Sequence, residues 1–449
     1  MIAVPMKRFL QTFGELIRRP RAQASASVLF GTVIGALASF IAAMVAVRTL
    51  SVDGFAAFGV GIAVNSLTMQ FADLGLGTVA MAEAAEATGP HEARNRLLRL
   101  AIRRLATAVG SGVLIAVAVI FIPSLEPYRE VALIAVGGGV LGCISLFTVG
   151  ALQAFRRFGM AGAVQVTIGI ARLTLVVAAA VVGLGAPAMM VGYGVIAPVI
   201  GAVLGAWVLI RHSESELEKV PPDPVVEAEL EFEDREEGPD GRYRRTRRRY
   251  IAIMSVFAAL LINGDVLLLT LVGTQSDVAS YSAAWRFAAG LLLLNAALSS
   301  STLPFVLASG DPWKEALKLT KLGTGIAVVQ LIFVVPLTFI GVAVLGSAGD
   351  DAMKPLAVLL VAFSLEAFIF ITHQVFYRIR RERFLAWMTG VELLVMAGVT
   401  LLLRSHGAMA PAFGQLAARV VVIGISMAPV VLQATGRINW FETDIEEQV

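Results

Sequence analysis

The sequence predicts an all-α, polytopic membrane protein with about 12 transmembrane helices in two parallel six-helix lobes. Three observations lead to this fold class: an apolar composition, long apolar blocks, and a weak repeat between the two halves. Of the 449 residues, 57% are hydrophobic and only 15% are charged, whereas soluble domains carry roughly 45–50% and about 25%. Because such a chain has too little polar surface to cover a water-soluble globule, a soluble enzyme is excluded.

The apolar blocks have the length of about 20 residues that crosses a hydrocarbon core roughly 30 Å thick. The predicted spans are 24–47, 55–80, 104–122, 131–153, 161–184, 186–210, 250–273, 281–307, 323–346, 355–377, 384–403 and 411–433. With an inside N-terminus, the inside segments hold 29 of the 36 Lys and Arg residues and the outside loops hold 4. Short basic loops stay in the cytoplasm, so both termini are predicted to be cytoplasmic.

The spans divide the chain into five parts. Residues 1–23 place apolar residues on one helical face among basic ones, which is typical of a cytoplasmic helix lying in the membrane interface. The other parts are a first lobe (24–212), a disordered linker (213–249), a second lobe (250–433) and a cytoplasmic tail (434–449). The linker is acidic first and arginine-rich last, and its basic end is expected to attract anionic headgroups rather than nucleic acid.

Short matches between the two halves indicate an internal repeat. Val47-Arg-Thr-Leu-Ser51 is similar to Val272-Gly-Thr-Gln-Ser276, and Ala186-Pro-Ala188 is similar to Ala410-Pro-Ala412, with offsets near 225 residues. Six-span halves have the same orientation, so the repeats are parallel and related by an axis along the membrane normal. This architecture is typical of transporters whose two bundles rock around a central cavity.

The sequence lacks the features that are typical of several function classes. Cys143 is the only cysteine, and the four histidines are scattered, so no disulfide and no metal site is expected. The sequence has no P-loop and no nucleophile elbow, and the outer loops are too short to hold a polymerase acceptor. An enzyme is therefore not expected, and no cofactor beyond a coupling H⁺ or Na⁺.

Ionisable side chains inside the predicted spans are the candidate site residues, because each one costs about 2.5–3.5 kcal/mol on insertion scales. The arginines Arg172, Arg286 and Arg419 suit phosphate, since a guanidinium donates two parallel hydrogen bonds and stays charged. The acids Asp265, Glu366 and Glu392 could take up H⁺ or Na⁺. Two alternatives remain open here: Arg286 and Asp73 could snorkel to the nearer interface, and Glu392 and Arg419 could form a structural ion pair.

Two sets of motifs resemble a known family. Arg48-Thr-Leu-Ser-Val-Asp-Gly-Phe55 and Asp73-Leu-Gly-Leu-Gly-Thr78 flank the second predicted span, and Tyr281-Ser-Ala-Ala-Trp-Arg286 opens the eighth. These runs are similar to the polysaccharide (O-antigen, lipid-linked oligosaccharide) flippase branch of the multidrug/oligosaccharidyl-lipid/polysaccharide exporter superfamily. The resemblance implies a V-shaped, two-lobed bundle in a bacterial plasma membrane, with Arg286 at the family's cationic position. Arg48 and Asp73 are assigned a gating or structural role.

The function that follows is ion-coupled flipping of a polyprenyl-pyrophosphate-linked oligosaccharide from the cytoplasmic to the outer leaflet. Arg172, Arg286 and Arg419 are expected to bind the pyrophosphate, and Asp265, Glu366 or Glu392 the returning ion. The expected partners are the lipid-linked oligosaccharide, anionic membrane lipids and glycan-assembly proteins. Two alternatives are a cation-coupled multidrug exporter of the same superfamily and a non-transporting scaffold that recruits cell-wall enzymes through residues 213–249.

Overall fold

The computed structural model describes residues 20–73, 90–155, 157–212, 242–308, 312–346, 349–378 and 381–434. The predicted interfacial segment up to residue 19, linker residues 213–241 and the tail from residue 435 lie outside these ranges. Every regular element in the described part of the chain is helical, and the all-α prediction is confirmed.

The first lobe holds six predicted spans in nine helical segments. They are α2 (Pro20–Thr49), α3 (Val52–Asp73), α5 (Pro90–Phe121), the short 3₁₀ helix η1 (Pro123–Tyr128), α6 (Arg129–Ala154), α7 (Phe158–Val181), α8 (Ala186–Met190), the π-helix η2 (Val191–Ile196) and α9 (Ala197–His212). The sixth span is thus built from α8, η2 and α9 in succession.

The second lobe holds the other six spans. They are α11 (Arg242–Val272), α12 (Gln275–Ala308), α13 (Pro312–Leu345), α14 (Gly349–Arg378), α15 (Glu382–Leu402) and α16 (Met409–Ala434), with the 3₁₀ turn η5 (Arg404–His406) before the last. Helix α11 begins at Arg242 rather than at residue 250, so the arginine-rich end of the predicted linker is helical. Apolar blocks mark only the part of a helix inside hydrocarbon, whereas backbone hydrogen bonding continues into the headgroup layer.

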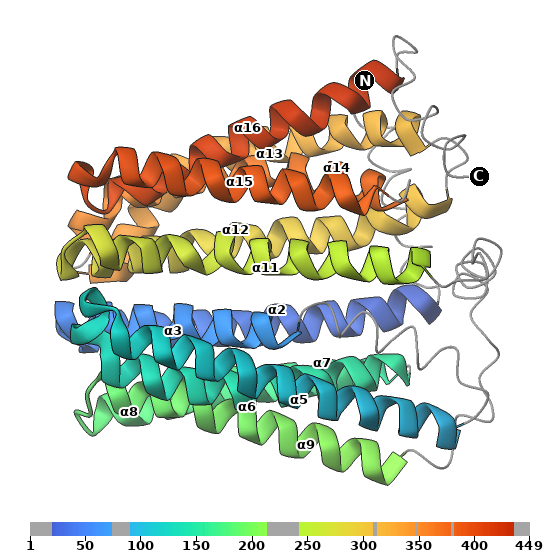
Figure 1. The fold of residues 1–449 in the computed structure, drawn as a ribbon. Helices are drawn as coiled ribbons and strands as arrows, with labels where there is room; N and C mark the ends of the chain where they lie inside the picture. Colours follow the sequence, from blue (N-terminus) through green and yellow to red (C-terminus); the bar gives the residue numbers. More distant parts are fainter. Residues whose placement is uncertain are drawn as a thin grey trace.

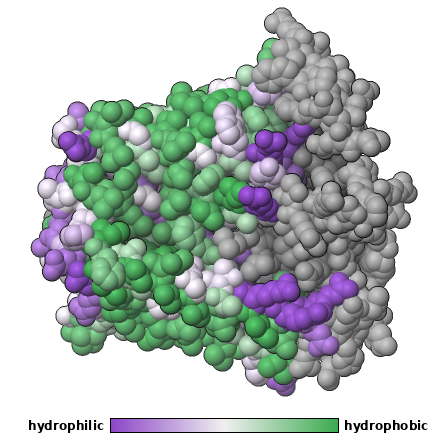
Figure 2. Space-filling view, viewed as in Figure 1, coloured by the Kyte–Doolittle hydropathy of each residue, from purple (hydrophilic) through white to green (hydrophobic). Residues whose placement is uncertain are grey.

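The helices are suited to crossing a bilayer. Within the described ranges, 11 helices are long and apolar enough to span it, and the 34-residue α12 covers the remaining predicted span. Figure 2 shows a broad hydrophobic area over the visible face of the bundle, with hydrophilic residues at the left end and in patches toward the right. Large apolar side chains such as Leu114, Phe339 and Leu394 are exposed. The prediction of a multi-pass membrane protein with about 12 helices is confirmed.

The two lobes repeat the same helix packing. In the first lobe α2 packs on α7, α3 and α5 on α6, and α9 on both α6 and α7. In the second lobe α11 packs on α15, α12 and α13 on α14, and α16 on both α14 and α15. The first lobe lies below the second in Figure 1. The equivalent pairs follow the same order along the chain, as the parallel repeat predicts.

Among the described residues, the lobes share an apolar core at one end of the bundle. We call this the loop end, because Leu50–Ser51, Val182–Gly185 and Gly273–Thr274 connect helices there; α9 ends and α11 begins at the opposite, linker end. One apolar cluster joins both lobes and includes Phe55, Phe58, Val278, Tyr281 and Leu345. Toward the linker end each lobe has a cluster of its own, including Leu152, Val164 and Val208 in the first and Ile369, Phe376 and Leu385 in the second.

The splayed linker end is visible in the ribbon, where α9 and α16 lie at opposite edges of the bundle (Figure 1). At the loop end the backbones approach closely, since a Cβ atom built on Gly59 of α3 would lie 2.6 Å from the Oγ of Ser282 in α12. The described part of the chain therefore has its lobes joined at the loop end and separate cores at the linker end. This is the V shape that the resemblance implied.

Candidate functional site

Three of the predicted residues form one buried ion cluster in the second lobe. The guanidinium of Arg419 in α16 forms ion pairs with Glu366 in α14 and Glu392 in α15. Arg419 is only 3% exposed. Two carboxylates thus surround one cation in the apolar interior, where an unpaired charge is strongly disfavoured. The ion pair that the sequence left open for Glu392 and Arg419 is formed, and Glu366 completes it from a third helix.

Asp265, from the C-terminal half of α11, is fully buried and interacts electrostatically with this cluster. Its carboxylate accepts hydrogen bonds from the hydroxyl of Tyr281 (2.5 Å), the amide of Gln415 (2.8 Å) and the backbone N–H of Val266 (2.7 Å). Asp265 also interacts electrostatically with Arg286 and Arg419. Its charge is therefore compensated by three hydrogen-bond donors, while two arginines lie within electrostatic range.

Arg172 is the mid-membrane arginine of the first lobe and has neutral partners. From α7 it donates to the backbone carbonyl of Tyr193 and to the hydroxyl of Ser39, each at 3.3 Å. Its guanidinium carbon lies 4.6 Å from the centroid of the Tyr193 ring, in a cation–π arrangement. Tyr193 lies in the π-helix η2, the kind of irregular turn that is frequent at functional sites.

The glycines of η2 allow this arrangement. A Cβ atom on Gly192 would lie 2.9 Å from Leu175 Cβ of α7. On the opposite side, the carbonyl of Gly194 lies against Gly138 of α6, closer than a Cβ atom would permit. Glycine at these contacts lets η2 pack closely between α6 and α7, and so it places the Tyr193 ring against Arg172.

Arg286 of α12, in the second lobe, lies within electrostatic range of Arg172 and Tyr193 in the first. Its guanidinium carbon lies 5.0 Å from the ring centroid of Trp285, and the side chain is only partly buried. Arg286 interacts electrostatically with Tyr193 and Arg172 of the first lobe and with Asp265 of its own. Its guanidinium therefore lies within electrostatic range of the first lobe. Among the described residues, neither Arg172 nor Arg286 forms an ion pair with a carboxylate.

Asp73 pairs with an arginine that the sequence analysis did not single out. Arg104 Nη2 of α5 lies 2.5 Å from Asp73 Oδ1 at the end of α3, and Arg104 is buried. Its guanidinium carbon is 5.9 Å from the Phe147 ring centroid. Arg104 stood at the edge of a predicted span, but α5 begins at Pro90, so the residue lies well inside the helix. An ion pair is formed where snorkelling was the open alternative for Asp73.

Arg48 joins the lobes at the loop end. From the end of α2 it donates to the backbone carbonyls of Val344 (2.7 Å) and Ala343 (2.9 Å), which belong to the last turn of α13. Terminal carbonyls of a helix have no intrahelical donor, and a cation there is favoured by the helix dipole. This contact is consistent with the gating or structural role predicted for Arg48.

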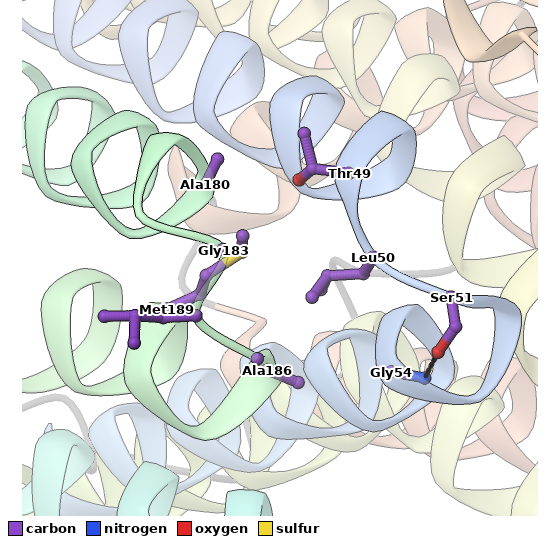
Figure 3. Close-up of a pocket in the computed structure, with 10 residues that line it drawn as sticks. Thr49, Leu50, Ser51, Gly54, Ala180, Gly183, Ala186 and Met189 are labelled. Atoms are coloured by element: carbon purple, nitrogen blue, oxygen red, sulfur yellow. Dashed lines mark hydrogen bonds between the residues drawn. The ribbon is translucent and has the colours of Figure 1, made fainter.

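A pocket in the described part of the first lobe is lined by none of these charged residues. It has a volume of about 240 Å³ and is lined at the loop end by residues including Thr49, Leu50, Gly183 and Met189. Figure 3 shows these side chains around the opening, with Ser51 accepting a hydrogen bond from the backbone of Gly54. None of its ten lining residues is ionisable, so it lacks the groups that a pyrophosphate requires. We find no cluster of three or more His, Cys, Asp or Glu side chains with metal-ligand geometry among the described residues.

Three residues that reasoning from sequence missed lie in this site. Gln415, Tyr193 and Arg104 each contact a charged residue that was predicted. Only Gln415 had a usable signal, since it precedes Arg419 by four residues and so shares its helix face. Polar residues within apolar spans do not by themselves reveal which neighbouring helix they meet.

Comparison with known proteins agrees with this fold. Residues 22–222 match a family model described as "Polysaccharide biosynthesis protein". Solved structures match both lobes. An "inward-facing conformation of a multidrug resistance MATE family transporter of the MOP superfamily" is 14% identical with a TM-score of 0.63, covering 92% of this chain and 95% of that one. The outward-facing conformation described in the same words is 14% identical with a TM-score of 0.60, covering 94% and 98%.

A third structure, "MATE in complex with MaD5", is 15% identical with a TM-score of 0.62 and covers 94% of this chain and 98% of that one. A search of curated proteins finds no match. The sequence match covers the first lobe, and the structural similarity extends over both lobes. The chain therefore has the fold of these MATE transporters, and the family match over residues 22–222 agrees with the resemblance indicated by its motifs.

Proposed function

We propose that this protein flips a polyprenyl-pyrophosphate-linked oligosaccharide from the cytoplasmic to the outer leaflet of a bacterial plasma membrane, by ion-coupled alternating access. The observation that carries the proposal is the pair Arg172 and Arg286. The two arginines come from opposite lobes, lie within electrostatic range of each other, and have no carboxylate partner among the described residues. The positive charge at the lobe interface is thus available to a ligand.

The chemistry of this pair suits an anion with several oxygens. Guanidinium groups bind phosphate through paired, charge-assisted hydrogen bonds and keep their charge when desolvated. The rings of Tyr193 and Trp285 support the two guanidinium groups without neutralising them. The polysaccharide family match of residues 22–222 supports a glycan-linked substrate. The lipid chain would remain in the bilayer while the head group occupies the lobe interface.

The packing of the lobes supports rocking about the loop end. Since the shared core lies there and each lobe has a separate core at the linker end, we assign this conformation to the state that loads substrate. The excess of Lys and Arg in the segments at the linker end supports a cytoplasmic location of that end and of both termini. Anionic headgroups would bind these basic segments, and residues 213–241 could contact glycan-assembly proteins.

We assign ion coupling to Asp265, Glu366 and Glu392, with H⁺ or Na⁺ as the coupling ion and no resident cofactor. Arg419 belongs to this cluster rather than to the pyrophosphate site in our proposal, because Glu366 and Glu392 already bind its guanidinium. A proton or Na⁺ arriving at one of these carboxylates would change the charge balance around Arg419. Such a change in a buried cluster can bias the equilibrium between two conformations.

The test is a flipping assay with purified protein in liposomes, using a fluorescent polyprenyl-pyrophosphate oligosaccharide with and without an imposed pH or Na⁺ gradient. We expect gradient-dependent movement with the wild type and none with Arg172→Ala. The matched control is Arg129→Ala, because Arg129 donates only to the carbonyl of Ile120 near the loop end and should flip like the wild type. Normal flipping by a folded Arg172→Ala protein would remove Arg172 from the site.

The second candidate is a cation-coupled multidrug exporter, which is favoured by the three buried carboxylates and by the MATE fold. A cationic drug needs a carboxylate that is free to bind it. Here Glu366 and Glu392 are occupied by Arg419, and Asp265 by three donors. Efflux of a cationic dye without flipping of the lipid probe would support this candidate over the flippase. If deletion of residues 213–241 is enough to abolish function, this would support the third alternative, a non-transporting scaffold that recruits cell-wall enzymes.

A further inference from the structure

Asp265 lies between the proposed substrate site and the ion cluster, and it raises a problem for anion binding. It interacts electrostatically with both Arg286 and Arg419. In an apolar interior a carboxylate attracts a nearby guanidinium strongly. An ion pair between Asp265 and Arg286 would neutralise the cation that the pyrophosphate needs, yet the structure has no such pair.

The reason lies in two donors from neighbouring helices. Tyr281 of α12 and Gln415 of α16 both donate to Asp265 Oδ2, at 2.5 Å and 2.8 Å. The second oxygen accepts from the backbone of Val266, at 2.7 Å. An ionised carboxylate offers about four acceptor sites, and three are already occupied here. The donors satisfy the carboxylate within its own lobe, without Arg286.

Both donors are themselves firmly placed. Tyr281 is fully buried, and Gln415 is 1% exposed. The Gln415 amide also donates to the carbonyl of Leu261 at 3.0 Å, one turn before Asp265 on α11. The hydrogen bonds therefore connect α11, α12 and α16, which also carry Asp265, Arg286 and Arg419. Neither donor was assigned a role by its sequence motif or by the proposed function.

We infer that Tyr281 and Gln415 are positioning residues for anion binding: they retain the Asp265 carboxylate so that Arg286 stays free for the pyrophosphate. This inference rests on the proposed function. Without one donor, an oxygen of Asp265 loses a charge-assisted hydrogen bond in a site that water does not reach. Arg286 is then the available cation within range, because Arg419 is already bound by two carboxylates.

The experiment measures equilibrium binding of a fluorescent polyprenyl pyrophosphate to the purified full chain in detergent, with inorganic pyrophosphate as competitor. Tyr281→Phe removes one hydroxyl and leaves the ring in the core, and Gln415→Met keeps the volume of the side chain. We expect each variant to bind the probe on the order of tenfold more weakly, the equivalent of one charge-assisted hydrogen bond.

The decisive arm is rescue. When Asp265→Asn is combined with either substitution, the carboxylate that competes for Arg286 is gone, so the affinity should return to the wild-type value. A purely structural role for Tyr281 or Gln415 predicts no rescue, because the second substitution removes a further buried interaction. Gln330→Met is the matched control: it removes a buried amide from the same lobe whose partner is Asn295, and it should leave the affinity unchanged.

Each outcome decides one of the two proposals. The inference is overturned if Tyr281→Phe and Gln415→Met bind the probe as well as the wild type. It is also overturned if Asp265→Asn restores the affinity of neither variant. In both cases binding by the wild type leaves the proposed function standing. If the wild type binds neither probe, the proposed function fails and the inference with it. Thermal melting of every variant identifies those that do not fold, and either donor alone is sufficient for the test.

Discussion

The two lobes have the same helix packing, but the buried arginine in each lobe has different partners. In each lobe one arginine connects the fifth and sixth spans: Arg172 reaches from α7 to Tyr193 of η2, and Arg419 reaches from α16 to Glu392 of α15. In the first lobe the partner is a carbonyl and a ring, whereas in the second lobe the partners are carboxylates. The same packing therefore leaves the charge of Arg172 available and neutralises that of Arg419.

The lobes also differ in how their first and fifth spans pack. Helix α2 meets α7 backbone to backbone, since a Cβ atom on Gly35 would lie 2.5 Å from the carbonyl oxygen of Gln165. The equivalent contact in the second lobe, between α11 and α15, uses side chains. A Cβ atom on Gly390 would meet the ring of Phe257 at 3.0 Å. At this pair of contacts the first lobe uses small residues, whereas the second lobe uses a ring.

If this comparison is right, the largest effect on stability comes from Arg419. Arg419→Met leaves Glu366 and Glu392 buried without a cation, and we expect a loss of about 3–5 kcal/mol in the free energy of unfolding. Arg172→Met loses hydrogen bonds and a cation–π contact with neutral groups, so its loss should be about 1–2 kcal/mol. Thermal or denaturant unfolding of the purified variants compares the two lobes directly.

The control for Arg419 replaces the whole ion cluster. Glu366→Gln, Glu392→Gln and Arg419→Met together remove all three charges, and the stability should recover most of the loss. A triple variant as unstable as Arg419→Met would show that the arginine stabilises the lobe through its packing rather than its charge. Equal losses for Arg172→Met and Arg419→Met would end the distinction between the lobes.

A smaller effect is expected from the glycine contact in the first lobe. Gly35→Ala places a methyl group against the backbone of α7, which can yield only if the helices separate, so we expect a loss of about 1–3 kcal/mol. Gly264→Ala in α11 is the matched control, because its Cβ atom would meet only Leu260 of the same helix, at 3.9 Å. This control should be neutral or slightly stabilising. Similar melting curves for the two variants would contradict backbone packing of α2 on α7.

The smallest effect concerns the contact between the lobes. Arg48→Gln removes the exposed hydrogen bonds to Val344 and Ala343, so the population open at the loop end should rise about 2–10-fold. Spin labels at the exposed positions Val182 and Leu402 would report that opening, after replacement of the buried Cys143. Arg129→Gln is the control, because its hydrogen bond stays within one lobe. Unchanged distance distributions in Arg48→Gln would remove Arg48 from gating.

The charged residues show how far the sequence alone could go. Apolar blocks identified Arg172, Arg419 and Asp265 as buried in the membrane, and all three are inside helices of the bundle. The same pattern could not distinguish a guanidinium that is available from one that is neutralised. Arg172 and Arg419 each join the fifth and sixth spans of their lobe, yet only the helices packed against them decide their partners.

The sequence by itself determined the number of spans, their repeat in two lobes and the residues whose charge is unusual in a membrane. Hydrophobicity and charge are local properties, so a window of about 20 residues is enough to detect them. The tertiary structure decided which charges meet. Ion pairs and hydrogen bonds such as Arg419–Glu392 and Gln415–Asp265 join different helices, 27 and 150 residues apart in the sequence. Their formation depends on how helices rotate and approach one another, and glycine contacts such as Gly194–Gly138 set that geometry.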